Sequence, residues 1–359
     1  MAEDGGTGDE GRTRPSGRGS GRAWRIAPFA LVALVTIGWS IGWVLVRDRV
    51  VTEMDRALGV EATLGREWTC ADRRVGGFPF RIDISCASLG VADARGTAIE
   101  LGPTRAVAQI YNPRHVIVQS AGPVRAQGGD GRLEGEWQSL EASIRDLGRG
   151  TEQLALVASG TRLVAETSQS PVGPVEARAD RVELYARPMP GSTNGTVDVV
   201  LRADGLDAPA LAEALALTSP AAIELQLRAH GVRAASGSSL FDYLETWRGL
   251  GGSVDVEVLE LDAGGTRVRT TGTIALDEER RPLGQIEASA RGLGPAAARL
   301  VGDNPGFAGA ALVAALGGAA APDAQAEAPL TPLPPVRLQD GRVFVGPVAL
   351  PGIALRPLY

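Results

Sequence analysis

The sequence predicts an α+β protein, predominantly antiparallel β, in which one N-terminal transmembrane helix precedes a long curved meander sheet with a few helices packed on it. Residues 26–46 contain no ionisable side chain, as a membrane span requires. In residues 223–229 apolar and polar side chains alternate with a period of two, which is typical of a half-buried strand, and this pattern recurs along the chain. Turn-forming pairs such as Gly264-Gly265 and Asp340-Gly341 separate these segments, which indicates a meander.

The charge-free segment predicts both an anchor and an orientation. As a helix, residues 26–46 would cover roughly 30 Å, the thickness of the hydrocarbon layer of a bilayer. Arginines crowd the segment before it, whereas Arg47, Asp48 and Arg49 nearly cancel after it, so the N-terminus is expected in the cytoplasm and the body in the periplasm. The preceding arginines are Arg12, Arg14, Arg18, Arg22 and Arg25. We therefore expect a single-pass protein of the bacterial inner membrane with a disordered cytoplasmic tail, residues 1–25.

A cleaved signal peptide is the alternative interpretation of the same segment. The apolar stretch is longer than the apolar region of a typical signal peptide, and it ends without a small-x-small cleavage site. These two features favour an anchor that stays attached.

Composition narrows the functional classes. The chain has 359 residues, enough for a packed core in one large or two smaller domains. The net charge is -6 and aromatic residues make up 4% of the chain, which disfavours a phosphate-binding groove or a base-stacking surface. Nucleic acid is therefore not expected as a partner. All cationic side chains are arginine and none is lysine, which indicates GC-rich coding and favours a bacterial source.

Two cysteines, Cys70 and Cys86, are expected to form a structural disulfide, because an exported body meets an oxidising environment. Residues 68–70 read as the end of one strand and residues 80–86 as the next, with the turn motif Gly77-Phe78-Pro79 between them. A turn centred near Phe78 would place the two cysteines opposite each other in an antiparallel ladder. A redox-active pair is the alternative, but the C-x-x-C spacing and a nearby histidine are both missing.

The rest of the chain divides by composition and pattern. Residues 47–64 extend the anchor helix as a stalk, and residues 65–317 form the β-rich body. Residues 318–335 consist largely of alanine and proline and read as a linker. Residues 336–359 contain further strands, which we expect to return to the sheet because an isolated hairpin is marginally stable in water.

Helical patterns interrupt the strands in residues 208–217, 238–250 and 295–301. The first follows a predicted N-cap at Asp207 and has proline early in the helix. The first and third each follow a strand that ends in a Gly-Leu pair. Strand, Gly-Leu turn and helix therefore form a predicted repeated unit.

No residue stands out as catalytic, and no cofactor or metal site is predicted. His115 and His230, the two histidines, lack the spacing of metal ligands or of a nucleophile and its base. The glycines of residues 128–131 lack the Lys-Ser/Thr of a phosphate-binding loop and read as a turn. Residues 277–279 are acidic, but two arginines follow at once, which is typical of a solvated hairpin tip. We therefore do not expect an enzyme.

The chain resembles domain-of-unknown-function family 2125, a set of bacterial envelope proteins found mainly in alphaproteobacteria. The motifs that carry the resemblance are Trp68-Thr69-Cys70, Gly77-Phe78-Pro79-Phe80-Arg81, Cys86, residues 272–277, residues 281–284 and residues 338–347. The layout is also similar to AsmA-like periplasmic proteins. That wider resemblance implies a long curved sheet with an apolar groove and a role in outer-membrane biogenesis or lipid traffic. The family has no established catalytic residues, so the resemblance assigns none to this chain.

Three hypotheses for the body remain open. In the first, the curved sheet exposes part of its apolar face and binds a lipid or another hydrophobic ligand. In the second, helices cover that face and the body is an envelope scaffold or protein-interaction domain. The third is an uncharacterised enzyme. Alternation on one face fits the first two equally, because it shows that the face avoids water without showing what covers it.

Overall fold

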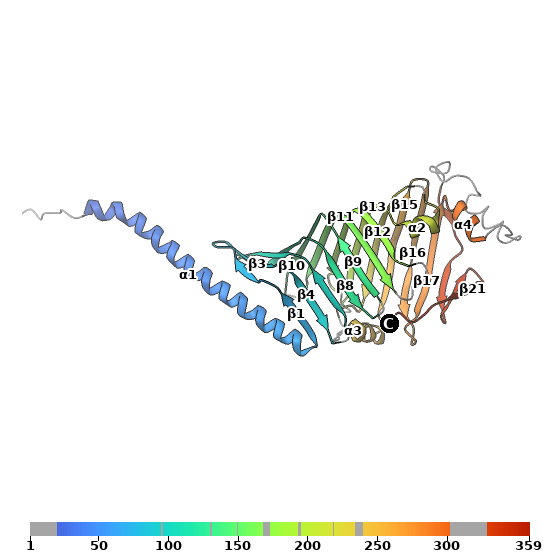
Figure 1. Ribbon diagram of the computed structural model, residues 1–359, viewed down its shortest axis with the longest axis horizontal. Coiled ribbons are helices and arrows are strands. Elements are labelled where there is room, and N and C mark those ends of the chain that lie inside the picture. The colour runs from blue at the N-terminus through green and yellow to red at the C-terminus, as the bar shows by residue number, and fades with distance from the viewer. Residues whose placement is uncertain are drawn as a thin grey trace, which may run out of the picture.

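The computed structural model contains one long N-terminal helix and a β-rich body (Figure 1). Residues 1–19 of the predicted tail and residues 318–328 of the predicted linker lie outside the described residues. The structure describes residues 20–94, 96–129, 131–148, 150–167, 173–192, 195–217, 219–233, 240–301 and 329–359.

Helix α1 (Ser20–Thr63) contains both the segment predicted as the anchor and the one predicted as the stalk. From Arg25 onward it is long and apolar enough to cross a membrane, and none of its most apolar stretch is buried against the body. The same length and composition occur in N-terminal signal sequences. The end of α1 lies along the edge of the sheet, where Glu61 pairs with Arg66 at 2.6 Å and Asp55 with Arg73 at 2.7 Å. The helix therefore covers an edge that would otherwise be open to pairing.

The body is one antiparallel sheet in which the strands from β10 (Ser139–Arg145) to β17 (Pro282–Arg291) pair in chain order, and the shorter strands before β10 combine into longer bent strands that do the same. The predicted antiparallel meander is therefore confirmed. The strands are β1 (Arg66–Cys70), β2 (Arg74–Gly76), β3 (Arg81–Cys86), β4 (Leu89–Asp93), β5 (Ala98–Leu101), β6 (Thr104–Gln109), β7 (Asn112–Ser120), β8 (Val124–Gly128), β9 (Gly131–Glu136), β10 (Ser139–Arg145), β11 (Gln153–Thr167), β12 (Val175–Pro188), β13 (Val197–Leu206), β14 (Ala221–His230), β15 (Ser253–Ala263), β16 (Thr266–Leu276), β17 (Pro282–Arg291), β18 (Thr331–Pro332), β19 (Val336–Gln339), β20 (Arg342–Val345) and β21 (Val348–Ala354).

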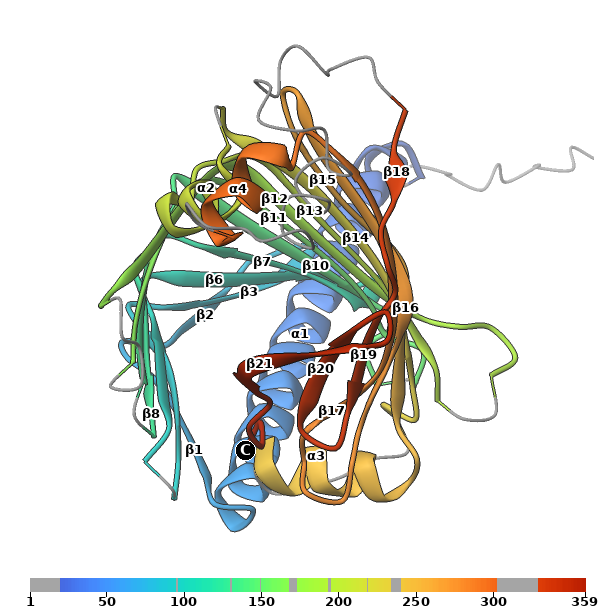
Figure 2. The ribbon, with the colours of Figure 1, turned by 90° about the vertical axis from the view of Figure 1, so that its right-hand side faces the viewer.

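The N-terminal strands are halves of longer strands that bend. β1 continues into β2 and β3 into β4, and β1 pairs with β4 while β2 pairs with β3. The same alternation of partners between half-strands continues as far as β10. We call the line along which these strands change direction the bend. β11 is continuous across the bend, and its first half pairs with β10 and its second half with β9. We call β2, β3, β6, β7, β10 and the first half of β11 limb A, and β1, β4, β5, β8, β9 and the second half of β11 limb B. Figure 2 shows β1 and β8 of limb B turned away from β6 and β7 of limb A.

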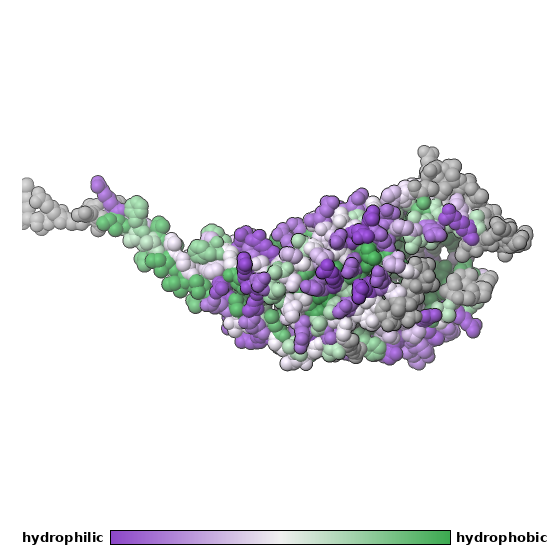
Figure 3. Space-filling view, viewed as in Figure 1, coloured by the Kyte–Doolittle hydropathy of each residue, from purple (hydrophilic) through white to green (hydrophobic). Residues whose placement is uncertain are grey.

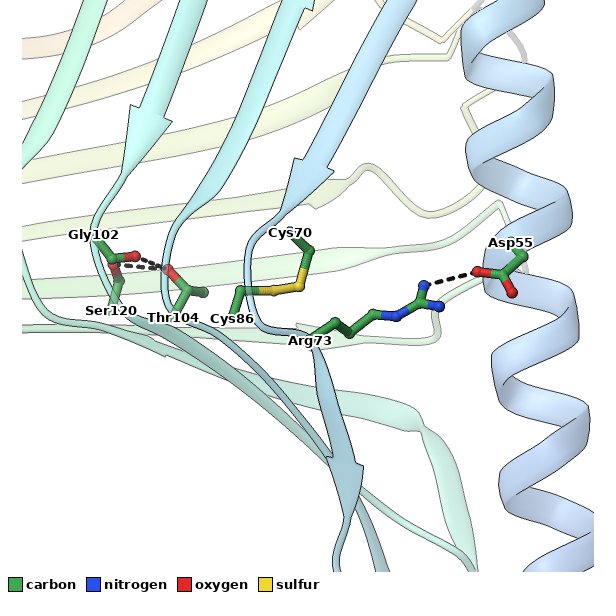
Figure 4. The surroundings of a disulfide bond; sticks show 7 residues. All are labelled: Asp55, Cys70, Arg73, Cys86, Gly102, Thr104 and Ser120. Carbon is green, nitrogen blue, oxygen red and sulfur yellow. Dashed lines mark hydrogen bonds and ion pairs between the residues drawn. A yellow bond between two sulfur atoms is a disulfide. The ribbon is translucent and has the colours of Figure 1, made fainter.

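Small side chains line the bend. Thr104 and Ser120 are each 6% exposed, and their hydroxyl oxygens lie 3.2 Å apart (Figure 4). On β11 and β12, Ala158 is 4% exposed and Ala179 is 6% exposed. Bulkier residues do not fit here because the backbones of neighbouring strands approach closely at the bend. A β-carbon on Gly102 would lie 2.5 Å from the carbonyl oxygen of Ala121, which is backbone and has little freedom to move.

We expect Gly102→Ala to destabilise the protein by about 1–3 kcal/mol, because the added methyl group overpacks the bend. Gly76→Ala is the matched control, since a β-carbon there meets no atom within 4 Å and φ is not positive. The control should change the unfolding free energy by less than about 0.5 kcal/mol. Urea unfolding of both variants checks this, and equal stability of the two would contradict close approach at the bend.

Helices α2 (Pro209–Leu215) and α4 (Gly294–Val301) follow β13 and β17 and contact each other (Figure 2). A glycine with positive φ lies at the end of each strand: Gly205, at +62°, is the next-to-last residue of β13, and Gly292, at +72°, follows β17. Glycine adopts this conformation without strain. The predicted repeat of strand, Gly-Leu turn and helix is therefore present. The predicted N-cap at Asp207 is wrong: Ala208 is the cap without a side-chain bond, because the backbone of Asp207 stays paired with Arg178.

α2 covers one end of the sheet. A small core forms beneath it from Ala221, Leu261 and Ala263, which are 1%, 8% and 1% exposed. Leu211 and Leu215 of α2 pack against this core. Burial of these side chains, rather than the length of so short a helix, stabilises α2.

Helix α3 (Leu240–Gly249) lies at the opposite ends of the strands, between β14 and β15. Its Trp247 is 8% exposed and donates a hydrogen bond from Nε1 to the carbonyl oxygen of His230 at 2.6 Å. Glu245 accepts hydrogen bonds from Arg248, from Arg280 at 2.9 Å and from the hydroxyl of Tyr359 at 3.2 Å. The C-terminus is therefore joined to α3 and to the β16–β17 turn.

Hydrogen bonds from Arg248 and Arg280 lower the pKa of Glu245 from its ordinary value of 4.5 to about 2. A carboxyl whose pKa is depressed in the folded state stabilises that state above pH 4.5 and loses this contribution as the pH falls towards 2. We expect Glu245→Gln to lower Tm at neutral pH, and the difference from the wild type to disappear in that acid range. Measuring the Tm of both proteins by thermal unfolding between neutral pH and pH 2 checks this expectation. Glu278→Gln, on the exposed tip of the neighbouring turn, is the control; a Glu245→Gln difference that does not change with pH would contradict the assignment.

Candidate functional site

One face of the sheet is apolar from β3 to β20. Residues directly opposite each other in neighbouring strands point to the same side of a sheet. Cross-strand pairing from Ile82 onward connects a row that contains no polar side chain. The row is Ile82, Ala108, Val116, Ile144, Leu154, Ala186, Val199, Leu227, Val256, Gly272, Ile286, Val336 and Val345.

A second row two residues further along the strands is also apolar, except for Thr270. It consists of Ile84, Ala106, Val118, Ala142, Leu156, Leu184, Leu201, Leu225, Leu259, Thr270 and Ala288. We call the surface formed by these two rows the apolar face. Within the two rows only Ile82 is buried, at 6% exposed, and the other side chains remain partly exposed. A filled core of leucines would instead be fully buried.

The opposite face carries the charge. Glu224 pairs with Arg202 at 3.2 Å, and Arg228 pairs with Asp198 at 3.3 Å and with Glu257 at 2.8 Å. Hydrogen bonds from Gln226 and then from Arg202 lower the pKa of Glu224. Each exposed pair contributes little stability, but together they keep this face in water and leave the apolar face as the side that avoids it.

Limb B has its own apolar rows, on the side that meets limb A. The first row consists of Cys70, Leu89, Leu101, Val124, Gly135 and Leu163. The second row consists of Trp68, Val91, Ile99, Ala126, Leu133 and Ala165. Of these, Trp68, Ile99 and Leu163 are 41%, 42% and 40% exposed. Large apolar side chains are therefore accessible on both limbs.

The disulfide shows which side of the bend is apolar. Cys70 lies on the apolar row of limb B, and Cys86 pairs with Thr104 on the same side of β3 as Ile82. Their sulfurs are bonded, and their Cα atoms are 5.2 Å apart (Figure 4). Side chains that meet across a bend point to its inside. The apolar faces of both limbs therefore face each other across a concave surface.

The expected disulfide is present, but the geometry predicted for it is wrong. Cys70 and Cys86 are not opposite each other in a ladder: Cys70 is opposite Leu89 of β4, and the β2–β3 ladder has Arg74 opposite Ser85. The bend at residues 71–73 brings the sulfurs together across this offset. The disulfide therefore links limb A to limb B. In an unbent hairpin it would have linked two neighbouring strands.

Strands and short helices border the concave side. In Figure 2 the two limbs and the strands from β16 to β20 surround a central space, with α2 and α4 at one border and α3 at another. The space-filling view shows the body hollowed near its C-terminal end, with hydrophobic side chains inside the hollow (Figure 3). A cavity of about 670 Å³ lies instead on the charged face, lined by Tyr185, Asp198 and Arg228 among others. Asp198, Arg228 and Glu257 of this lining form ion pairs with one another, whereas the apolar face continues across the sheet, so the apolar face is the stronger candidate for a ligand.

One hydrogen-bonded group has the order of a nucleophile, a base and an acid. Thr196 Oγ1 lies 3.2 Å from His230 Nδ1, and His230 Nε2 lies 2.8 Å from Asp255 Oδ2. The bond from His230 lowers the pKa of Asp255. Thr196 is only 4% exposed, so its hydroxyl lies within the body rather than on its surface. These hydrogen bonds join β14 and β15 to the residue before β13, a contact that no sequence spacing indicated.

The other residues singled out in the sequence have ordinary surroundings. His115 Nε2 bonds to Ser143 at 2.9 Å across β7 and β10. Asp277 accepts a hydrogen bond from Arg281 at 2.8 Å, as expected for a hairpin tip. In the described part of the chain, no three His, Cys, Asp or Glu side chains are placed to hold a metal ion. The turn motif Gly77-Phe78-Pro79 lies between β2 and β3, against α1.

These features define a class of protein: one N-terminal helix suited to a membrane span, followed by a single bent antiparallel sheet whose inner face is apolar. The chain belongs to the bacterial family described as "Uncharacterized protein conserved in bacteria (DUF2125)", whose model matches residues 43–353. No curated protein and no solved structure matches the chain. The family predicted from the sequence motifs is thereby confirmed, whereas the wider resemblance to AsmA-like proteins is not shown.

Proposed function

We propose that this protein is held in the bacterial inner membrane by α1 and binds lipid on the apolar face of its body, which lies in the periplasm. The apolar face carries this proposal, because both of its rows, apart from the buried Ile82, remain partly exposed across the sheet. Leaving apolar surface in water costs about 25 cal/mol per Å². Acyl chains remove that cost without needing polar partners.

The shape of the face fits a chain-like ligand. The rows cross the strands at about 4.8 Å per strand, so they offer a long and narrow apolar path. Along this path the small side chains of Ala106, Ala108 and Ala142 leave room beside larger ones such as Ile144. No charged residue belongs to either row, so the hydrophobic part of a lipid meets no unpaired charge.

The location rests on the anchor and on the disulfide. The arginines before α1 favour a cytoplasmic N-terminus, and a bonded Cys70–Cys86 pair favours an oxidising compartment. To test the location, a reporter enzyme that works only outside the cytoplasm is fused to the chain after Tyr359. We expect this fusion to show reporter activity. Activity restricted to a cytoplasmic reporter would overturn the location.

Photo-crosslinking of the full-length chain in its own membrane tests lipid binding. A photoreactive residue at Leu225 points from the apolar face, whereas one at Gln226, the next residue, points from the charged face. We expect mass spectrometry to find lipid adducts at position 225 and not at position 226. An adduct with a protein at position 225 would favour the scaffold hypothesis, and no adduct there would contradict ligand binding on this face.

A further inference from the structure

The turn between β2 and β3 packs against the part of α1 that is suited to lie in the membrane. Trp39 Nε1 donates a hydrogen bond to the carbonyl oxygen of Pro79 at 2.8 Å, and Trp39 and Phe80 have ring centroids 5.7 Å apart. One turn of helix later, the ring centroids of Trp43 and Phe78 are 5.6 Å apart. In Figure 1 the N-terminal end of β3, which follows this turn, lies beside α1. We call residues 77–80 the β2–β3 tip.

The position of these contacts along α1 sets their depth. The charge-free segment ends at Val46, three residues after Trp43 and seven after Trp39. At 1.5 Å per residue, Trp43 and Trp39 lie about 5 and 10 Å inside the end of that segment. When α1 spans a bilayer, side chains packed on these indoles lie in the interface and the adjoining acyl region.

The tip has the composition and hydrogen bonding that this environment requires. Its residues, Gly77, Phe78, Pro79 and Phe80, include no charge. The two phenylalanines are 54% and 60% exposed even with α1 beside them. The carbonyl oxygens of Gly77, Pro79 and Phe80 accept hydrogen bonds from Arg81, Trp39 and Ile110, respectively. Exposed phenylalanines are unfavourable in water, whereas a tip whose carbonyl groups at Gly77, Pro79 and Phe80 are hydrogen-bonded is suited to lipid.

We propose that the β2–β3 tip inserts into the periplasmic leaflet of the membrane that α1 spans, with Phe78 and Phe80 among the lipids. This inference rests on the anchoring in the proposed function and adds a second membrane contact to it. Phe80 is two residues before Ile82, so the inserted tip adjoins the first residue of the apolar face. The near end of the lipid-binding face then opens at the bilayer surface, where lipid exchanges with it directly.

A depth measurement on the full-length chain tests the insertion. Phe80→Cys supplies one reactive thiol, since the native cysteines are bonded to each other, and carries a fluorescent label in liposomes of phosphatidylethanolamine and phosphatidylglycerol. Leu250→Cys is the control, because Leu250 is 56% exposed and lies beside α3, away from the tip. We expect lipids with a nitroxide on the upper acyl chain to quench the label at position 80 several-fold more strongly than the label at position 250.

The outcomes separate the two proposals. Release of the chain from liposomes by alkaline carbonate would show that the anchor itself fails. A chain that resists carbonate but has an unquenched label at position 80 overturns the insertion alone. A water-soluble maleimide gives a second readout: insertion predicts slow labelling of Phe78→Cys until detergent is added, and rapid labelling before detergent contradicts it. If the thiol at position 78 is protected from maleimide while the label at position 80 stays unquenched, protein rather than lipid covers the tip, and this result also overturns insertion.

Discussion

An arginine placed at Leu201 is expected to remove bound lipid from the body while leaving the sheet folded. Leu201 lies in the second row of the apolar face, between Leu184 and Leu225. A guanidinium group placed among acyl chains must either give up its hydration water or displace the lipid, and either costs several kcal/mol. Since 1.4 kcal/mol corresponds to a factor of ten, we expect lipid recovered with Leu201→Arg to fall at least about tenfold. Quantitative lipid mass spectrometry of the purified full-length variant measures this.

The same variant distinguishes an open face from a covered one. On an open face the arginine stem lies along its apolar neighbours and the charged end reaches water, so the loss of unfolding free energy should be about 1–2 kcal/mol. In a closed core an unpaired charge would cost about 3–5 kcal/mol. Val200→Arg, on the adjacent residue of the opposite face, is the control and should retain its lipid. Unchanged lipid in Leu201→Arg would place the ligand elsewhere.

Removal of the disulfide should weaken the fold by about 3 kcal/mol, the largest loss of stability that we expect from the chain. Cys70 and Cys86 are 16 residues apart, and closing a loop of that size restricts the unfolded chain by about this amount. The bond also joins limb A to limb B at the inside of the bend. The double variant Cys70→Ser, Cys86→Ser should therefore unfold at a lower temperature than the wild type.

Reducing agent provides the control for this variant. Dithiothreitol should lower Tm of the wild type to that of the double variant and leave the double variant unchanged. If the oxidised wild type and the double variant unfold at the same temperature, the disulfide does not hold the limbs together.

Local patterns predicted much of the fold because they depend on neighbouring residues. Alternation in residues 223–229 identified a half-buried strand, and Asp340-Gly341 identified the turn between β19 and β20. The repeated Gly-Leu turns identified the starts of α2 and α4, since positive φ at Gly205 and Gly292 is a local requirement. These signals suffice for a meander, in which each strand pairs with the next.

The bend escaped prediction because no residue marks it by itself. Residues 71–73 interrupt the alternation between β1 and β2, and read alone they look like part of a turn. The bend becomes evident only when ladder partners are known, since β1 pairs with β4 while β2 pairs with β3. The hydrogen bonds of His230 to Thr196 and Asp255 were missed for the same reason, because 34 and 25 residues separate them.

The charge-free helix, the antiparallel strands, the pairing of the two cysteines and the family were all predictable from the amino-acid sequence. Each depends on composition, on a period of two or on a short motif. The tertiary structure alone decided that the sheet folds along a bend, that the apolar sides of limbs A and B face each other, and that the β2–β3 tip meets α1 at Trp39 and Trp43. Alternation fixes which side chains share a face, whereas the direction in which a sheet curves depends on contacts between residues far apart in the chain.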